Sequence, residues 1–203
     1  PFAETDKADT QMTIYAATKK ASENMAHVYA HLHALPVTMF RFFTVYGAWS
    51  RPDMVPFKFA ELMRAGRPID IYNNGDMFRD FTFVDDLVEG ITRLIDVIPP
   101  SPAVRPAVGV PGDSLSDVAP FRVVNIGNGD KVRLMDFISA LEQELGVQAE
   151  KNFLPMQPGD VPATCASADL LEALTGAMPK TNYRDGIAAF ATWYRDYFSK
   201  RDG

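Results

Sequence analysis

The run Val37-Thr38-Met39-Phe40-Arg41-Phe42-Phe43 sets the fold class of this chain. It is apolar almost throughout, which is typical of a strand buried in a parallel sheet. The residues before it, 13–35, have the pattern of a long helix, with Thr13 or Thr10 as the candidate N-cap. A long helix followed by a buried strand predicts an α/β fold.

The rest of the chain continues this alternation. We expect helices at 56–65, from Asp85 or Asp86 as a cap to about 97, and at 134–145, 169–174 and 183–198. Short strands are predicted at 69–72, 81–84 and 121–126, with a turn at 73–76. Residues 99–120 hold six of the fifteen prolines and predict an excursion with no core of its own.

Composition narrows the class of protein. The 203 residues suffice for one domain or a little more, and 47% apolar with 23% charged residues is ordinary for a globular protein. The net charge of −6 argues against general nucleic-acid binding. No apolar run is long enough to span a membrane. The single cysteine, Cys165, excludes an internal disulfide and suits a cytoplasmic location.

Tyr15 and Lys19 are the first candidates for chemistry. Their spacing of four places both side chains on one face of the predicted helix, about one turn apart. An ammonium close to a phenol favours the phenolate, which would suit Tyr15 to act as a general base or acid. The spacing alone also fits an ordinary surface pair. Lys20 lies about 100° further round the helix, so we expect it to be solvated.

Further motifs follow in a fixed order: Thr44-Val45-Tyr46-Gly47, Arg51-Pro52-Asp53-Met54, Arg79-Asp80-Phe81, Asn125-Ile126-Gly127-Asn128 and Gln157-Pro158-Gly159-Asp160. With Tyr15-x-x-x-Lys19, this set resembles the extended short-chain dehydrogenase/reductase family of NAD-dependent nucleotide-sugar epimerases and dehydratases. It is most similar to the UDP-glucuronate 4-epimerases. The resemblance covers nearly the whole chain.

The resemblance implies a Rossmann-type fold with a smaller α/β substrate-binding lobe. Residues 1–50 would complete the NAD-binding domain, to which a strand at 121–127 returns. Residues 51–98 and 128–203 would form the lobe that binds the nucleotide sugar. The family's Gly-x-x-Gly-x-x-Gly turn, which holds the dinucleotide pyrophosphate, does not occur here. We therefore interpret the chain as the C-terminal part of a longer enzyme, inactive by itself.

The resemblance also assigns roles around the reacting sugar. Tyr15 would take the proton of the sugar hydroxyl, while Lys19 would contact the nicotinamide ribose of NAD and support the phenolate. Phe42 would line the nicotinamide site with its backbone. Thr44 and Arg51 are typical of the glucuronate-specific branch and would hold the substrate carboxylate in a site shielded from water. The alternative for Arg51 is a solvated loop cation.

Four residues are assigned to the UDP moiety in the same way. Arg79 would bind the pyrophosphate; the alternative is a salt bridge to Asp80 or Asp76. Phe81 stands where relatives carry an aromatic near the nucleotide, and Asp160 would contact the uridine ribose. Gln157 stands where many relatives carry Arg, so one phosphate-binding charge is absent. Whether Lys58 faces the groove or the solvent stays open.

The predicted helix 13–35 carries two further patterns. Its apolar stripe of Met25, Val28, Tyr29 and Leu32 fits either core packing or, by resemblance, a homodimer interface. We interpret His27 and His31 as partner-face or surface residues, because no carboxylate or thiolate at a matching spacing supports a metal site.

The resulting hypothesis is an NAD-dependent epimerisation at C4 of a UDP-sugar through a 4-keto intermediate, from UDP-glucuronate to UDP-galacturonate. The enzyme alternatives are a UDP-hexose 4-epimerase, a UDP-uronate decarboxylase and a nucleotide-sugar 4,6-dehydratase. The alternative from another class is a relative that binds a nucleotide sugar or a partner without catalysis.

Overall fold

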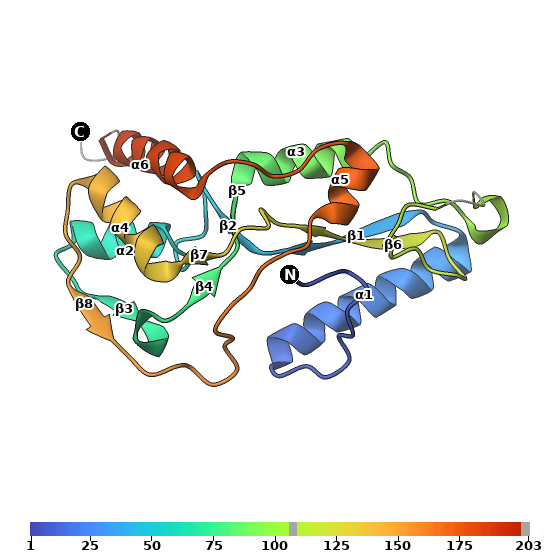
Figure 1. The fold of residues 1–203 in the computed structure, drawn as a ribbon, viewed down its shortest axis with the longest axis horizontal. Helices are drawn as coiled ribbons and strands as arrows, with labels where there is room; N and C mark the ends of the chain where they lie inside the picture. The colour runs from blue at the N-terminus through green and yellow to red at the C-terminus, as the bar shows by residue number, and fades with distance from the viewer. Residues whose placement is uncertain (106–108, 200–203) are drawn as a thin grey trace.

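The computed structural model describes residues 1–105 and 109–199 of an α/β protein. Figure 1 shows an elongated molecule with two groups of elements lying end to end. One group holds α1 (Ile14–His33), β1 (Val37–Phe42), α3 (Val84–Leu94), β6 (Phe121–Ile126) and α5 (Asp169–Thr175). The other holds α2 (Phe57–Arg64), α4 (Leu134–Leu145), α6 (Tyr183–Ser199) and several short strands.

The first group is built on the parallel pair β1–β6, in register from Val37 opposite Phe121 to Phe42 opposite Ile126. Because side chains alternate along a strand, β6 contributes side chains to both faces of the sheet. Phe121 and Val123 pack with Ala30 of α1. Val124 and Ile126 form a cluster with leucines of α3 and α5, namely Leu87, Leu94, Leu170 and Leu171. The pair is thus covered by α1 on one face and by α3 and α5 on the other.

The expectation of a buried strand at 37–43 is wrong in the end of the strand and in its degree of burial. The strand ends at Phe42, and its residues are only partly buried, with Phe42 50% exposed. Within the described ranges β1 has one hydrogen-bonded neighbour, β6, whereas β6 itself is buried along its whole length. The strand was correctly predicted to be of the parallel type.

The second group encloses a core rich in aromatic rings. Tyr46, Phe81, Phe137 and Phe190 are fully buried there, and the rings of Phe81 and Phe137 stack with centroids 3.8 Å apart. Burying a side chain of this size contributes roughly 1.5–3 kcal/mol. The core is held by α2, α4 and α6, which Figure 1 shows gathered at one end of the molecule.

The short strands pair with one another. Three pairs form: β2 (Thr44–Tyr46) with β5 (Phe81–Phe83) in parallel, β3 (Ile69–Ile71) with β8 (Lys151–Phe153) in parallel, and β4 (Phe78–Arg79) with β7 (Val132–Arg133) antiparallel. Of these strands, only those near 69–72 and 81–84 were predicted. Two or three residues are too few to show a period in the sequence. Two 3₁₀ turns, Tyr72–Gly75 and Pro102–Val104, complete the described elements.

Helix boundaries follow the predicted caps in two cases and depart from them in a third. Thr13 caps α1 by accepting a hydrogen bond from the backbone N–H of Ala16 at 3.1 Å, and Gly146 ends α4 with φ +68°. Asp85 and Asp86 do not cap α3. The helix begins earlier, at Val84. Asp86 instead accepts hydrogen bonds from the backbone of residues 180 and 181, which ties the segment before α6 to α3.

The Pro-rich excursion is attached to the first group at several points. Arg122 of β6 donates two hydrogen bonds of 2.9 Å to the buried carboxylate of Asp113. His27 bonds to Ser116 Oγ at 2.7 Å, and His31 bonds to the carbonyl of Val118 at 2.8 Å. The two histidines therefore fasten this segment to α1 and are not simply surface residues. Residues 106–108 of the excursion lie outside the described ranges.

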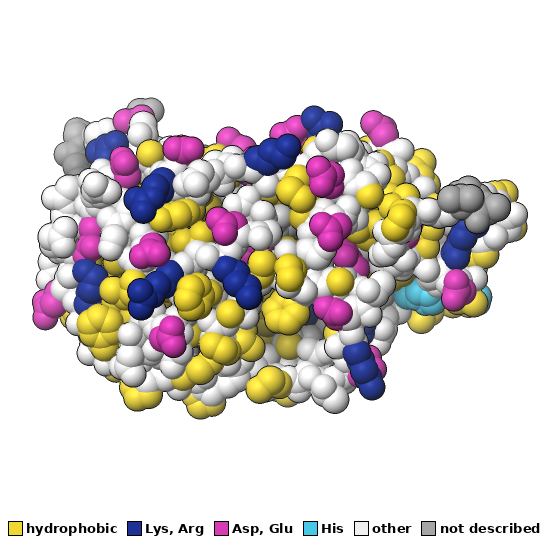
Figure 2. Space-filling model, viewed as in Figure 1, with side chains coloured by type: hydrophobic (Ala, Val, Ile, Leu, Met, Phe, Trp, Pro, Cys, Tyr) yellow, Lys and Arg dark blue, Asp and Glu magenta, His cyan; other side chains and the backbone are white. Residues whose placement is uncertain are grey.

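The surface is mixed in character. Figure 2 shows hydrophobic side chains and charges of both signs interspersed over the visible face. Within residues 1–105 and 109–199, no helix is long and apolar enough to cross a bilayer.

Candidate active site

Two cavities gather most of the predicted site residues. The first, of about 450 Å³, is lined by the N-terminal segment, α1 and the ends of β1 and β6, and it includes Tyr15, Lys19 and Phe42. The second, of about 420 Å³, is lined by Thr44, Lys58, Arg79, Phe81 and Asp160 together with parts of β3, α2 and α4. Arg51 and Gln157 belong to neither lining.

Tyr15 and Lys19 lie together at the rim of the first cavity. The cap at Thr13 starts α1 just before Tyr15, so the tyrosine falls in the first turn and Lys19 one turn later. The Lys19 ammonium lies 5.2 Å from the centre of the Tyr15 ring. The phenol is open to solvent, with Tyr15 71% exposed. A phenol with a cation beside it and free access is suited to exchange a proton with a bound hydroxyl.

An ion-pair cluster forms the base of this cavity. Arg41 of β1 donates hydrogen bonds of 2.7 and 2.8 Å to both carboxylate oxygens of Glu23, and Lys20 Nζ lies 3.2 Å from the same carboxylate. Burial by itself would raise the pKa of Glu23, but its bonds to Arg41 and Lys20 hold that pKa below its usual value. The expectation that Lys20 is solvated is wrong: α1 lies along β1, so this side of the helix faces Glu23 and Arg41.

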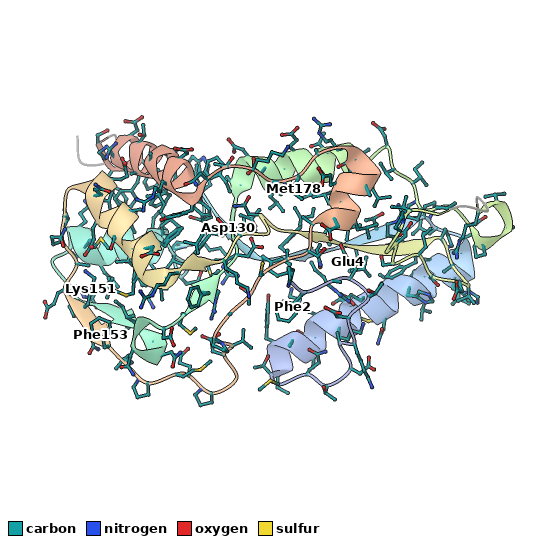
Figure 3. The ribbon with its side chains drawn as sticks, viewed as in Figure 1. Phe2, Glu4, Asp130, Lys151, Phe153 and Met178 are labelled. Carbon is teal, nitrogen blue, oxygen red and sulfur yellow. The ribbon has the colours of Figure 1, made fainter. Side chains whose placement is uncertain are left out.

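The N-terminal segment closes another side of the first cavity. The carboxylate of Glu4, which is buried, accepts the backbone N–H of Asn125 at 2.8 Å. The Asn125 side chain donates to the carbonyl of Phe2 at 2.9 Å. Figure 3 shows Phe2 and Glu4 between α1 and the β1–β6 pair. Burial raises the pKa of Glu4. Sequence reasoning gave these residues no role, because a lone Glu in a polar stretch carries no periodic signal.

The second cavity brings together residues that are far apart in the sequence. Arg79 Nη2 lies 2.8 Å from Asp160 Oδ1, and Arg79 Nη1 donates to the carbonyl of Phe78 at 2.9 Å. The partner of Arg79 is thus Asp160, neither Asp80 nor Asp76. Asp160 also accepts the N–H of Val161 at 2.8 Å. A directed guanidinium in a half-enclosed cavity is suited to bind phosphate oxygens.

A fully buried carboxylate, Asp80, holds the surroundings of Arg79. It accepts the backbone N–H groups of Asn128, Gly129 and Ala166 at 2.8, 3.0 and 2.9 Å. Position 127 beside it requires glycine, because a Cβ there would lie only 2.5 Å from the Ala166 Cβ. The carboxylate therefore joins β4, the end of β6 and the segment that continues from Asp160. In the sequence, the one sign of this structural role of Asp80 is an acid placed directly before an apolar strand.

Gln157 and Arg51, the two predicted site residues outside both linings, lie in different surroundings. Gln157 is exposed, and its carbonyl accepts the N–H of Asp160 in a turn. This turn touches the start of α1, because a Cβ on Gly159 would lie 2.7 Å from Thr13 Cγ2. The loop that carries Asp160 thus adjoins the helix that carries Tyr15, and the two cavities are neighbours.

Arg51 is paired with a residue that lines the second cavity. Its Nε and Nη2 donate to the two carboxylate oxygens of Asp53 at 3.0 and 2.5 Å, and Asp53 itself lines the cavity. The bond to Asp53 raises the pKa of Arg51. The Arg51 side chain is 73% exposed, so the described residues do not themselves shield it from water. Lys58, left open by the sequence, lines the cavity.

Known proteins resemble this chain in sequence and in fold. A probable UDP-glucuronate 4-epimerase of Rhizobium meliloti (strain 1021) is 58% identical over 96% of this chain and 57% of its own length. MoeE5, solved with UDP-glucuronic acid and NAD and also with UDP-glucose and NAD, superimposes with a TM-score of 0.80 at 28% identity over 97% of this chain and 60% of its own.

A third similar protein is the UDP-glucuronic acid 4-epimerase of Bacillus cereus, solved with UDP-glucuronic acid and NAD. It matches with a TM-score of 0.76 at 27% identity, over 97% of this chain and 59% of its own. The chain thus spans a little more than half the length of these proteins. The α/β architecture is that of the Rossmann-type epimerases. The model of the NAD dependent epimerase/dehydratase family matches residues 1–103, and the chain belongs to that family.

Proposed function

We propose that this chain contributes the catalytic tyrosine and the nucleotide-sugar site of an NAD-dependent UDP-sugar 4-epimerase, which converts UDP-glucuronate to UDP-galacturonate. The observation that carries the proposal is the adjacency of two cavities. One has Tyr15 and Lys19 at its rim, and the other holds Arg79 with Asp160 and Thr44. A sugar bridging the cavities would reach the phenol while its diphosphate stays at Arg79.

The residues of the first cavity suit one end of NAD. Lys19 offers an ammonium to ribose hydroxyls, and Phe42 and Phe43 offer apolar surface to a nicotinamide ring. The sequence has no glycine-rich turn for the pyrophosphate, so this chain would contact only the nicotinamide end. When bound, NAD supplies a hydride acceptor for C4 and later returns the hydride.

Proton transfer is assigned to Tyr15. Its phenolate would remove the proton of the 4-hydroxyl as the hydride departs, and its phenol would return a proton to the ketone oxygen as the hydride comes back. Lys19 would keep the phenolate stabilised between these steps. Arg79, oriented by Asp160, would anchor the diphosphate while the ketosugar turns to present its other face.

Thr44 and Arg51 are proposed to bind the substrate carboxylate. A 4-keto uronate is a β-keto acid, and it loses CO₂ most easily when the bond from C5 to its carboxylate stands perpendicular to the carbonyl plane. Thr44 lines the second cavity, and Arg51 is paired with Asp53, which also lines it. Together they would hold the carboxylate away from that geometry, which is orientation used to prevent a side reaction. A UDP-hexose epimerase is the second candidate, because MoeE5 was also solved with UDP-glucose.

A homodimer through α1 is part of the proposal. Met25, Val28, Tyr29 and Leu32 lie on this helix and are all more than half exposed, so they do not fill the core of this chain. An apolar stripe left open on a long helix fits a matching helix of a second copy. The free thiol of Cys165 is compatible with the cytoplasm, where we place the enzyme.

The test of the activity is Tyr15→Phe in the complete protein. The variant keeps the ring and loses the ionisable oxygen, so turnover of UDP-glucuronate is expected to fall about 10²-fold or more with little change in substrate affinity. Tyr29→Phe, on the same helix and similarly exposed, is the matched control. Turnover near that of the wild type in the Tyr15 variant would remove this residue from the mechanism.

A further inference from the structure

The two tryptophans of the chain contact each other. Trp49 lies in the loop between β2 and α2, and Trp193 lies on α6. Their ring centroids are 5.4 Å apart, and Tyr197, also of α6, meets the Trp49 ring edge-on at 5.6 Å. Trp49 is nevertheless 76% exposed. Its ring therefore contributes little to the core, and its contacts are made with α6 on the surface.

The backbone at Trp49 is constrained. Its φ of +60° is in the left-handed region, which is unusual for a bulky residue. Such a conformation persists only where the surroundings impose it, and it is found preferentially near functional sites. Ser50 donates its hydroxyl to the carbonyl of Gly47 at 2.9 Å, which closes the turn around Trp49. Arg51 follows directly after this turn.

The start of the same loop is also held by α6. The Tyr46 hydroxyl donates to the carbonyl of Tyr183 at 3.3 Å, and a Cβ on Gly186 would lie 2.0 Å from that hydroxyl oxygen. A Cβ on Gly47 would lie 2.4 Å from Val84. The stretch 46–49 thus follows α6 from Gly186 to Trp193. These contacts are made by residues outside the lining of the second cavity.

We propose that the contact of Trp49 with Trp193 and Tyr197 is a positioning device for Arg51 and so determines the selectivity for a uronate. The proposal rests on the carboxylate-binding role proposed above for Arg51. The ring holds the turn on α6, and the turn places Arg51 against Asp53, which lines the second cavity. Trp49 acts through Arg51 and does not itself touch the substrate.

The test compares Trp49→Gly and Trp49→Phe in the complete protein. Glycine accepts the left-handed backbone without strain, so this variant removes the ring contact and leaves the turn able to form. Because Trp49 is exposed, neither variant opens the core. With Trp49→Gly, kcat/KM for UDP-glucuronate should fall about 10-fold through displacement of Arg51, while kcat/KM for UDP-glucose stays within about 2-fold. Trp49→Phe should restore most of the selectivity.

Two further measurements show how the residue acts. The difference in circular dichroism between wild type and Trp49→Gly should contain the signal of two coupled indoles, which reports the contact independently of activity. Trp49→Gly should also release UDP-pentose from UDP-glucuronate, as Arg51→Ala should. Adding Trp49→Gly to Arg51→Ala should cause no further loss, because both changes remove the same interaction.

The outcomes separate the two proposals. If wild type prefers UDP-glucose, the carboxylate role of Arg51 is wrong and the inference falls with it. If wild type prefers UDP-glucuronate but Trp49→Gly lowers both substrates equally, the function stands and the inference is refuted. A double variant much worse than Arg51→Ala would likewise show that Trp49 acts independently of Arg51.

Discussion

Asp80→Asn tests whether a buried carboxylate organises the second cavity. Asp80 Oδ1 accepts the N–H of Asn128 at 2.8 Å and the hydroxyl of Thr82 at 3.2 Å. Oδ2 accepts the N–H groups of Gly129 and Ala166 at 3.0 and 2.9 Å. An asparagine must place its NH₂ at one of these positions. At Oδ2 it would face two N–H groups, so the less costly orientation places it at Oδ1.

In that orientation the hydroxyl of Thr82 can turn and accept, but the N–H of Asn128 faces another donor. Hydrogen bonds to a charged group are worth roughly 1.5–3 kcal/mol, and leaving a buried donor unpaired costs roughly 1–3 kcal/mol. The lost hydrogen bond and the unpaired donor are partly the same free energy, so the two values are not simply added. We expect Asp80→Asn to destabilise the fold by about 2–4 kcal/mol. Asp80→Ala would leave all three backbone N–H groups without this acceptor and should destabilise the fold further.

Urea unfolding followed by circular dichroism measures this difference, with Asp76→Asn as the control. Asp76 is four residues before Asp80, is exposed, and should change stability by no more than about 0.5 kcal/mol. The affinity for UDP should fall in Asp80→Asn only, since Asp80 joins Arg79 to the segment after Asp160. An Asp80→Asn protein as stable as the control would refute the reasoning that these hydrogen bonds organise the site.

Three more predictions follow from the site and the surface. Arg51→Ala should lower kcat/KM for UDP-glucuronate about 10- to 100-fold more than for UDP-glucose, with a UDP-pentose detected by mass; equal losses would leave Arg51 a structural role. Calorimetry on the 203-residue chain should find no micromolar binding of NAD, because the glycine-rich turn is absent, and such binding would contradict the interpretation. Leu32→Glu should halve the mass of the complete protein in light scattering, whereas Phe153→Glu, also on an exposed apolar residue, should not.

Long elements with clear ends were predictable from the sequence. The helix at 13–35 appears as α1 with its cap at Thr13, and the helix at 134–145 appears as α4 with Gly146 at its end. Both have a helical apolar period and a residue whose chemistry favours a helix end. The strand at 121–126 was also predictable, because four of its six residues are aromatic or β-branched apolar residues that favour strands.

Contacts between distant residues were not predictable in the same way. The sequence offered Asp76 or Asp80 as partners for Arg79, since both are close along the chain. The fold instead brings Asp160 to it across 81 positions. Asp86 shows the same limit, because its partners at 180 and 181 belong to another segment. Local patterns assign such acids to caps or neighbours, and only tertiary packing selects the actual partner.

The same packing argument bears on the proposed domains. The sequence placed residues 51–98 and 128–203 together in a substrate lobe. The structure packs α3 and α5 from these ranges against β6, whereas α2, α4 and α6 form a separate core. We therefore propose that α3 and α5 belong with the Rossmann-type part, where they cover the face of the sheet opposite α1.

Exposure divides the candidate site into two kinds of residue. Tyr15 and Arg51, which are proposed to meet the sugar, are each more than two thirds exposed. Asp80 and Tyr46 are fully buried and hold the backbone near the residues that are proposed to bind the sugar. A group that must meet substrate has to be accessible before binding, whereas a group that fixes geometry works best where its hydrogen bonds are not shared with water. Trp49 shares a property with each kind of residue, because it is exposed and yet held in place by the rings of α6.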